Sequence, residues 1–546
     1  MARPEMQRDR AKPAPDGAWW QRGVIYQIYP RSFQDGDGDG IGDLPGIRRR
    51  LGYLEELGVD AIWLSPVFVS PMKDFGYDIA DYRAIDPVFG TMADLEDLVA
   101  DAHGRGIRVV LDLVPNHTSD RHPWFAESRA TRKNPRRDWY VWRDPAPDGG
   151  PPNNWLAEFG GSAWTLDPAT GQSYYHAFLP EQPDLNWRNP EVRAAIYDVM
   201  RFWLDKGIDG FRVDVLWHLL KDDAFRDNPE NPDWHPGMSP THRLTPLYTT
   251  DLPDVHHIVR EMRAVVDEYE DRVLIGEIYL PIERLVRYYG ESRDGAHLPF
   301  NFALIDTPWD ARHIERLVAA YEAALPPGGW PNWVVGNHDK PRVAGRIGEP
   351  QARLAAMLLL TLRGTPTIYY GDEIGMGQGV IAAAAVRDPV EIAVPGFGLG
   401  RDGARTPMQW EAGPGAGFTD GTPWLPLAAD AEDRTVAAQV REPGSMLNLY
   451  RRLIALRRAR PTLSAGRYRA LAATGDLLIY LREDEAAHIL VALNLGDEPT
   501  SVELGAGFAG RVAVSSLPDR DGEVIAGRLD LRPADGLVVV LDAPPP

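Results

Sequence analysis

Eight short apolar segments recur along the chain, and this repetition limits its fold more than any other feature. Each has three to six residues, is rich in β-branched or aromatic side chains, and is expected to form a strand. Helical patterns separate most of them. The expected strands are 24–29, 61–64, 109–113, 210–213, 274–277, 299–303, 333–335 and 367–370. Alternating strands and helices predict an α/β protein, and eight such strands predict a (β/α)8 TIM barrel rather than an open doubly wound sheet.

The domain organisation follows from length and from two long connections. A chain of 546 residues is too long for one compact domain. The connection after the third strand is rich in Trp, Pro and Asn, and the one at 371–441 is rich in Gly and Pro. Residues 1–18 are polar and are expected to be a disordered lead rather than a signal peptide. The other expected parts are the barrel at 19–114 and 191–462, an inserted domain at 115–190, and a C-terminal β-sandwich domain at 463–546.

Composition excludes several classes of partner. The formal net charge of −21 opposes binding to nucleic acid or to an anionic membrane. No apolar run reaches the length of a membrane span. The chain has no cysteine, which excludes thiol catalysis and predicts a reducing, cytoplasmic location. No glycine-rich dinucleotide fingerprint follows the first strand, so no organic cofactor is expected. We expect a small-molecule substrate and a monomer or small homo-oligomer.

An acidic loop follows the first strand. Asp35, Asp37, Asp39 and Asp43 are separated mostly by glycines, and Ile41 could contribute its backbone carbonyl. Four carboxylates this close repel one another unless a cation gathers them, and hard oxygen ligands suit Ca²⁺ or Mg²⁺. The spacing resembles an EF-hand loop, but a glycine occupies the position of its bidentate glutamate. We therefore expect these five residues to form a structural Ca²⁺ (or Mg²⁺) site, with a solvated acidic turn as the alternative.

Polar side chains cluster at or after the carboxyl ends of five expected strands. Arg212 and Asp214 are two residues apart on the fourth strand, so they share one face. The carboxyl ends of barrel strands meet at one rim, where barrel active sites lie. Buried carboxylates are costly unless paired, so five converging clusters are hard to explain by packing alone. The other clusters are Asp74 with Tyr77, Asp112 with Asn116 and His117, Glu277, and Asn337 with His338 and Asp339.

Three carboxylates with two histidines and an arginine fit glycoside hydrolysis. A retaining mechanism needs an ionised nucleophile and a second carboxyl that stays protonated until it donates to the leaving oxygen. Asp214 suits the first role, because the adjacent Arg212 guanidinium favours the charged carboxylate. Glu277 follows an apolar strand and is expected to have the raised pKa that the second role needs. A catalytic metal site is the alternative, although the chain lacks a compact motif such as H-E-x-x-H.

Four of these clusters resemble the motifs of the α-amylase family, glycoside hydrolase family 13. They are Asp112-Leu-Val-Pro-Asn116-His117, Gly210-Phe-Arg212-Val-Asp214, Gly276-Glu277-Ile-Tyr279 and Val335-Gly-Asn337-His338-Asp339. The acidic loop and two further segments are similar to the α-glucosidase and oligo-1,6-glucosidase branch. Those segments are Gln182-Pro-Asp-Leu-Asn186-Trp187 and Arg401-Asp402-Gly-Ala-Arg405-Thr-Pro-Met-Gln-Trp410. The resemblance covers essentially the whole chain after residue 18, and it implies an inserted domain B and a C-terminal domain C.

The resemblance also implies a role for each residue of the site. Asp214 would be the nucleophile, Glu277 the general acid/base, and Asp339 the stabiliser of the transition state. The residues implied to bind sugar are Asp74, Tyr77, His117, Phe178, Arg212, His338 and Arg401.

A closed pocket follows from the same resemblance. Tyr77 would stack on the sugar ring, and Asp74 with Arg401 would recognise the non-reducing glucose, while Arg405 is expected to contact sugar less than Arg401. A blind pocket releases one sugar at a time. The implied activity is a retaining, exo-acting α-glucosidase on short oligosaccharides or α-glucosides, with a covalent glucosyl intermediate on Asp214.

The sequence leaves open which glycosidic linkage is cleaved and whether the reaction is hydrolysis or transfer. Within the branch, Val directly after the nucleophile, here Val215, goes with α-1,6 activity and Thr with α-1,4. Trp217 and His218 depart from the Val-Ile-Asn of many oligo-1,6-glucosidases, so α-glucosidase ranks before oligo-1,6-glucosidase, and transglucosylation stays open as an added activity. One alternative is a glucosyltransferase or isomerase of the trehalose synthase or sucrose isomerase type. The other is a non-catalytic, transporter-associated relative, which should have lost the carboxylates that this chain keeps.

Overall fold

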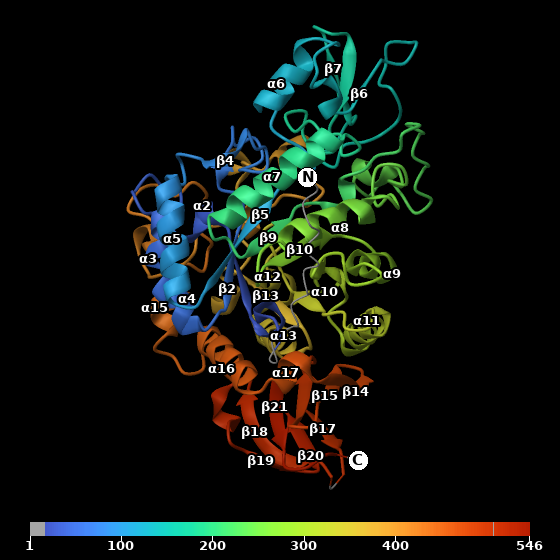
Figure 1. Ribbon diagram of the computed structural model, residues 1–546. Helices are drawn as coiled ribbons and strands as arrows, with labels where there is room; N and C mark the ends of the chain where they lie inside the picture. The colour runs from blue at the N-terminus through green and yellow to red at the C-terminus, as the bar shows by residue number, and fades with distance from the viewer. Residues whose placement is uncertain (1–16, 506, 546) are drawn as a thin grey trace, which may run out of the picture.

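The computed structural model describes residues 17–505 and 507–545, and its centre is an eight-stranded barrel (Figure 1). Neighbouring strands in the sheet pair in parallel. All eight expected strands are present, so the predicted TIM barrel is confirmed. They are β1 Ile25–Ile28, β2 Ala61–Leu64, β5 Arg108–Leu113, β9 Gly210–Val213, β10 Val273–Ile278, β11 Leu298–Asn301, β12 Asn332–Val334 and β13 Thr365–Tyr369.

Alternate strand residues fill the barrel interior. Ile25 of β1 packs there with Val110, Ile275 and Phe300 in one buried apolar cluster. Because side chains two apart share a face, Gln27 also points inward, one level nearer the carboxyl ends of the strands. Where β11 meets β12, the Asn301 backbone N–H donates to Asn332 Oδ1 at 2.9 Å.

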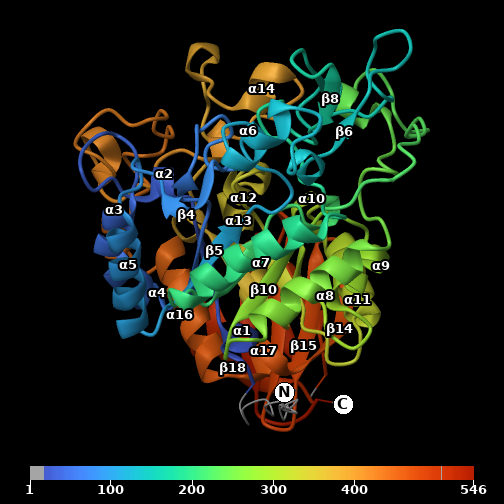
Figure 2. The same ribbon diagram turned by 45° about the horizontal axis from the view of Figure 1, so that its top comes forward.

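Amphipathic helices surround the barrel (Figures 1 and 2). On α8, the buried residues recur every three or four positions, from Val255 through Ile258 and Met262 to Val266, which is the spacing of one helix face. The start of α5 is fixed by a capping box between Thr91 and Asp94. The longer covering helices are α5 Met92–Gly104, α7 Pro190–Asp205, α8 Val255–Val266, α11 Ala311–Ala324 and α13 Glu349–Thr361.

The chain between β5 and α7 forms a small unit above the barrel (Figures 1 and 2). It holds α6 Pro123–Ala130 and a three-stranded antiparallel sheet in the order β6–β8–β7. These strands are β6 Trp142–Arg143, β7 Trp164–Asp167 and β8 Gln172–Tyr175. The unit therefore contributes its residues to the rim formed by the carboxyl ends of the barrel strands.

The C-terminal part lies at the opposite end of the barrel, after α16 Met446–Ala459 (Figure 1). It contains a six-stranded antiparallel sheet and a separate two-stranded sheet, as expected of an all-β unit. The strands are β14 Arg467–Thr474, β15 Leu477–Glu483, β16 His488–Asn494, β17 Thr500–Glu503, β18 Ala509–Ser515, β19 Val524–Ala526, β20 Arg528–Leu531 and β21 Asp535–Leu541.

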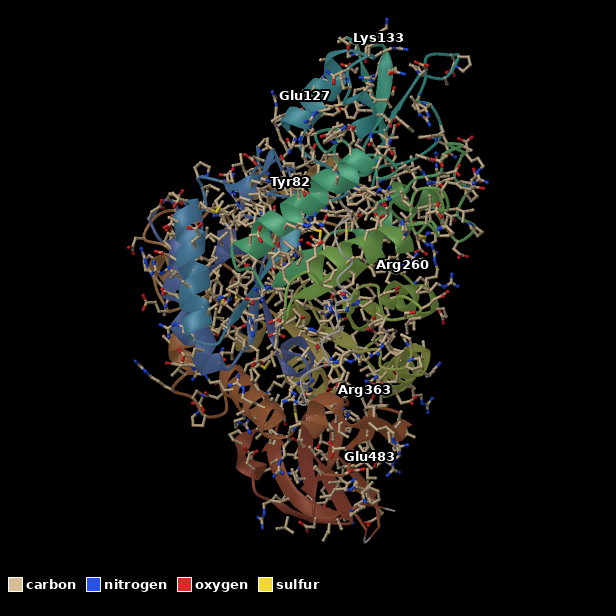
Figure 3. The ribbon with its side chains drawn as sticks, viewed as in Figure 1. Tyr82, Glu127, Lys133, Arg260, Arg363 and Glu483 are labelled. Atoms are coloured by element: carbon tan, nitrogen blue, oxygen red, sulfur yellow. The ribbon has the colours of Figure 1, made fainter. Side chains whose placement is uncertain are left out.

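A buried arginine ties this unit to the barrel. Arg482 of β15 is fully buried and donates to the backbone carbonyls of Thr361 and Leu463 at 2.5 and 2.6 Å. Figure 3 labels Arg363, just beyond the end of α13, and Glu483, the last residue of β15, on the two sides of this junction.

The N-terminal expectation falls mostly outside the described chain. Of the lead predicted at 1–18, residues 1–16 are not among the described residues, and α1 Trp19–Arg22 follows it. Within 17–505 and 507–545, every helix is too short or too polar to cross a membrane.

Candidate active site

One guanidinium joins the carboxyl ends of three neighbouring strands. Arg212 of β9 places Nη1 2.9 Å from Asp112 Oδ1 on β5 and 2.9 Å from Asp214 Oδ1 just after β9. Its Nη2 lies 2.8 Å from Glu277 Oε2 on β10. All four side chains are buried, and in the described part of the chain the ion pairs of the three carboxyls are all with this cation.

Burial dominates the ionisation of these carboxyls. It raises the pKa of Asp112 to about 7. Burial, followed by the charge of Glu277, raises the pKa of Asp214 well above its usual range, and burial also raises that of Glu277 as expected. Arg212 was expected to keep Asp214 ionised. It makes the contact and opposes the shift, but burial and Glu277 outweigh it, so the pair retains a proton to higher pH than separate carboxyls would.

Asp214 and Glu277 lie close together. They contact neighbouring nitrogens of Arg212, and the Arg212 charge lowers the pKa of Glu277 against the stronger effect of burial. The Val215 backbone N–H also donates to Glu277 Oε2 at 2.8 Å. Retaining glycosidases hold their carboxyls about 5–5.5 Å apart, whereas inverting enzymes leave about 6.5–9.5 Å for a water. Contact of both carboxyls with one guanidinium suits retention.

Asp339 is the most exposed of the three expected catalytic carboxylates, with 25% of its side chain accessible. Its Oδ1 lies 2.9 Å from Arg405 Nη2 and 3.5 Å from Arg401 Nη1, and its Oδ2 lies 3.2 Å from His338 Nε2. Burial would raise the pKa of Asp339, but His338 and the two arginines hold it well below the usual range. Asp339 is therefore a fixed anion that is partly open to solvent.

Asp74 and Arg401 meet as the closed-pocket expectation requires. Arg401 Nη2 lies 2.7 Å from Asp74 Oδ1, although the residues are 327 apart in sequence. Gln182 Nε2, from the segment after β8, reaches Asp74 Oδ2 at 3.3 Å. Asp388, which sequence reasoning missed, binds the same Arg401 nitrogen at 2.7 Å and caps α14 Pro389–Ala393. Its only sequence signal is an acidic residue before a proline, which indicates a helix cap and no site.

The remaining expected sugar-binding side chains line the same rim. Tyr77 stacks on His338 with ring centroids 5.5 Å apart, and its hydroxyl lies 3.0 Å from Asp112 Oδ2. His117 Nε2 approaches the Tyr77 carbonyl at 3.1 Å, and Phe178 packs 5.2 Å from the His117 ring. Burial lowers the pKa of His117 to about 4 and that of His338 to about 3, so both imidazoles are neutral near pH 7.

Two supporting cations complete the site. Arg405 is fully buried and donates to the His338 carbonyl at 2.9 Å as well as to Asp339. It therefore fixes the positions of His338 and Asp339 from the buried side of the rim. Lys221 was not singled out from the sequence. Its Nζ donates to Asn116 Oδ1 at 2.8 Å and to Asp184, and it joins the segment after β9 to the inserted unit.

The acidic loop brings three of its expected carboxylate ligands together. Carboxylate oxygens of Asp35, Asp37 and Asp39 lie within 4.8 Å of one another. Asp43 caps α3 Leu44–Arg49 through Oδ1, which accepts the Gly46 N–H at 2.6 Å, and its Oδ2 accepts the Gly36 N–H of the loop at 2.8 Å. Burial raises the pKa of Asp43, and the negative charges of Asp35 and Asp37 add to that shift. An all-oxygen donor set with this excess of negative charge fits Ca²⁺ or Mg²⁺.

Comparison with known proteins decides the family. The model of the family described as Alpha amylase, catalytic domain, matches residues 27–466. The chain belongs to the α-amylase family. The match begins inside β1 and spans the rest of the barrel, the inserted unit and every rim residue described above.

Named relatives place this α-amylase-family protein in the α-glucosidase branch. It is 44% identical to the "Probable alpha-glucosidase" of Rhizobium meliloti (strain 1021), covering 90% of this chain and 92% of that one. It is 41% identical to the oligo-1,6-glucosidase of Heyndrickxia coagulans, covering 89% and 93%. A solved structure of an alpha-glucosyl transfer enzyme, XgtA, superposes with a TM-score of 0.90 and 41% identity, covering 96% and 99%.

Proposed function

We propose that this protein is a retaining, exo-acting α-glucosidase that removes terminal non-reducing α-linked glucose from short oligosaccharides or α-glucosides. The observation that carries the proposal is the pair of Asp214 and Glu277 on one guanidinium, with the ionised Asp339 beside them. Relatives named alpha-glucosidase and oligo-1,6-glucosidase, matched over about nine-tenths of this chain, support the same substrate class.

The chemistry is a double displacement. Asp214 attacks the anomeric carbon, and the bond to the leaving oxygen breaks as Glu277 gives its proton to that oxygen. Glu277, now ionised, takes a proton from water, which attacks the same carbon and breaks the ester to Asp214. Arg212 contacts both carboxyls, so it balances negative charge on whichever of the two is ionised at each step.

The surrounding groups hold the glucose and close the pocket. Asp339 can only accept hydrogen bonds, and we assign it to sugar hydroxyls in the transition state, where a fixed anion also stabilises developing positive charge. The neutral imidazoles of His117 and His338 serve as hydrogen-bond partners without adding charge. Asp74 and Arg401 block further extension of the chain, which makes the cleavage exo-acting.

The proposal is tested by the anomer first released and by one substitution. Proton NMR of p-nitrophenyl α-glucoside hydrolysis should show α-glucose before mutarotation. Asp214→Ala should abolish release, while the folded protein keeps its melting temperature within a few degrees. First release of β-glucose, or undiminished turnover by the folded variant, would refute the assignment.

Glucosyl transfer is the second candidate. The overlap with XgtA, an alpha-glucosyl transfer enzyme, favours acceptors other than water. Product analysis on maltose, isomaltose and sucrose separates the outcomes: glucose as the main product indicates hydrolysis, and a new disaccharide or isomer indicates transfer. We assign Val215, directly after the nucleophile, as a residue that sets α-1,4 against α-1,6 preference.

We also propose that the acidic loop binds Ca²⁺ or Mg²⁺ for structure. Asp35, Asp37, Asp39 and Asp43 would hold the ion with their carboxylates, and Ile41 with its backbone carbonyl. The ion would neutralise clustered carboxylates and take no part in the reaction.

We also propose a cytoplasmic location, which the absence of cysteine supports, and a monomer or small homo-oligomer.

A further inference from the structure

Gln27 lies in the barrel interior directly beneath the sugar-binding rim. It is fully buried on β1, and its side-chain nitrogen lies 2.8 Å from His338 Nδ1. The same nitrogen is 3.4 Å from Ser65 Oγ, a much longer contact. Gln27 lies below His338 and was not selected by any motif. Its effect on the reaction would therefore act through that imidazole.

The proton on His338 can be placed from its other nitrogen. Nε2 lies 3.2 Å from Asp339 Oδ2, and the Asp339 carboxylate can only accept. Nε2 also lies 2.8 Å from the Tyr77 hydroxyl, whose own proton goes to Asp112 Oδ2 at 3.0 Å. Both neighbours therefore require a donor at Nε2.

The imidazole is neutral, so a proton on Nε2 makes Nδ1 an acceptor. Burial lowers the pKa of His338 to about 3, with Asp339 opposing the shift and Arg405, Arg212 and Arg401 adding to it. In the described part of the chain, Gln27 Nε2 is the donor that reaches Nδ1. This also fixes the Gln27 amide, because its oxygen in that place would face the lone pair of Nδ1.

We propose that Gln27 is a positioning residue that holds His338 in the Nε2–H tautomer, so that the N–H meets the Tyr77 hydroxyl beside Asp339 at the sugar-binding rim. The rings of Tyr77 and Tyr29 lie nearly parallel to the imidazole, at 5.5 and 5.8 Å between centroids, and restrict its plane. These contacts do not by themselves prevent a 180° flip of the ring about Cβ–Cγ or a change of tautomer. The hydrogen bond from Gln27 removes both freedoms. The role in sugar binding rests on the proposed function, whereas the tautomer does not.

The test is a double-mutant cycle that separates positioning from general packing. Gln27→Met keeps the volume and removes the donor. It should lower kcat/KM on p-nitrophenyl α-glucoside by about 10- to 100-fold, the usual cost of losing a group that orients a site residue. In a His338→Ala background the same change should alter kcat/KM by less than about twofold, because the group it acts through is gone. Equal losses in both backgrounds would overturn the proposal.

Thr367→Val is the matched control. Thr367 is buried on β13, pairs with β1 at Ile25, and has no partner for its hydroxyl among the described residues. The substitution removes a hydroxyl from the same barrel interior and leaves the contacts of His338 unchanged. The control should retain wild-type kcat/KM. A loss equal to that of Gln27→Met would mean that interior packing, not His338, explains the effect.

Nitrogen NMR of histidine-labelled protein tests the tautomer without substrate. The wild type should show His338 protonated at Nε2, and Gln27→Glu, whose carboxylate can only accept, should move the proton to Nδ1 or protonate both nitrogens. Protonation at Nδ1 in the wild type would refute the inference. If the wild type fails to hydrolyse the glucoside, the proposed function fails, while the NMR result still decides the role of Gln27.

Discussion

Removing the guanidinium of Arg212 should disable the site through the ionisation of Asp214. Arg212→Met keeps the length of the side chain but removes the cation 2.9 Å from Asp214 Oδ1. For charge centres about 4 Å apart at an effective dielectric constant of about 20, the lost attraction is about 4 kcal/mol. That energy equals about three pKa units, so the ionised fraction of Asp214 would fall by up to about 1,000-fold. Protonation of Asp112 relieves part of this, and we expect kcat/KM to fall about 100- to 1,000-fold.

The assay is kcat/KM on p-nitrophenyl α-glucoside from pH 4 to pH 9. The acidic limb of the profile should move to higher pH in Arg212→Met, because the nucleophile then ionises at higher pH. Arg353→Met is the matched control, since Arg353 is also buried but donates to the carbonyls of Ser516 and Gly444 far from the rim. It should lose stability and keep kcat/KM. An Arg212→Met enzyme within tenfold of the wild type, with an unmoved acidic limb, would refute the reasoning.

Three further predictions concern linkage, stability and the cation. Val215→Thr keeps a β-branched residue at φ 37° and should raise the ratio of maltose to isomaltose hydrolysis; an unchanged ratio removes Val215 from linkage control. Burial raises the pKa of Asp372 from 3.8 to about 7, so the wild type loses stability as pH rises between these values. The free energy of unfolding of Asp372→Asn relative to the wild type should therefore rise between pH 4 and pH 8 by up to about 4 kcal/mol, and a pH-independent difference contradicts the shift. EDTA should lower the wild-type melting temperature. A free ion concentration of 100 times the Kd adds about 2.7 kcal/mol to the free energy of unfolding, and EDTA removes this contribution. Asp37→Ala with Asp39→Ala should abolish this response, and an equal response in the double variant excludes the loop.

The barrel was predictable because its strands are short, continuously apolar and separated by helical patterns. Each expected strand is found within two residues of its observed ends. Helix boundaries were less accessible: between β1 and β2 the helical stretch breaks at Arg50 into α3 and α4 Leu51–Leu57. Gly52 lies two residues after the break, but a single glycine in a helical pattern does not fix where a helix ends.

The site was predictable only where its residues lie in motifs at strand ends. Asp214 and Arg212 share a strand face, so their contact follows from local geometry. Asp388 and Gln27 were missed because their importance depends on Arg401 and His338, which are distant in sequence and meet them only after folding. The raised pKa of Asp214 could not be predicted from the sequence either, because the burial that causes it arises only when the rim has assembled.

The cation in the acidic loop stays a prediction, and the spacing of the aspartates predicts its ligands only in part. Asp35, Asp37 and Asp39 converge as the alternation of carboxylates with glycines suggests. Asp43 follows the same alternation, and one of its carboxylate oxygens caps α3 while the other accepts the Gly36 N–H inside the loop. Spacing alone cannot distinguish a ligand from a cap, since both need a short acidic side chain at a turn.

The central claim is that Asp214 forms a covalent bond to glucose, and trapping that bond tests it most directly. A 5-fluoro-α-glucosyl fluoride reacts through its good leaving group, while the ring fluorine slows the second displacement by destabilising positive charge at the anomeric carbon. Mass spectrometry of the digested protein should find one fluoroglucosyl group, carried by the peptide at Asp214. A label on another carboxylate, or steady turnover of the reagent with no adduct on the denatured protein, would contradict the account.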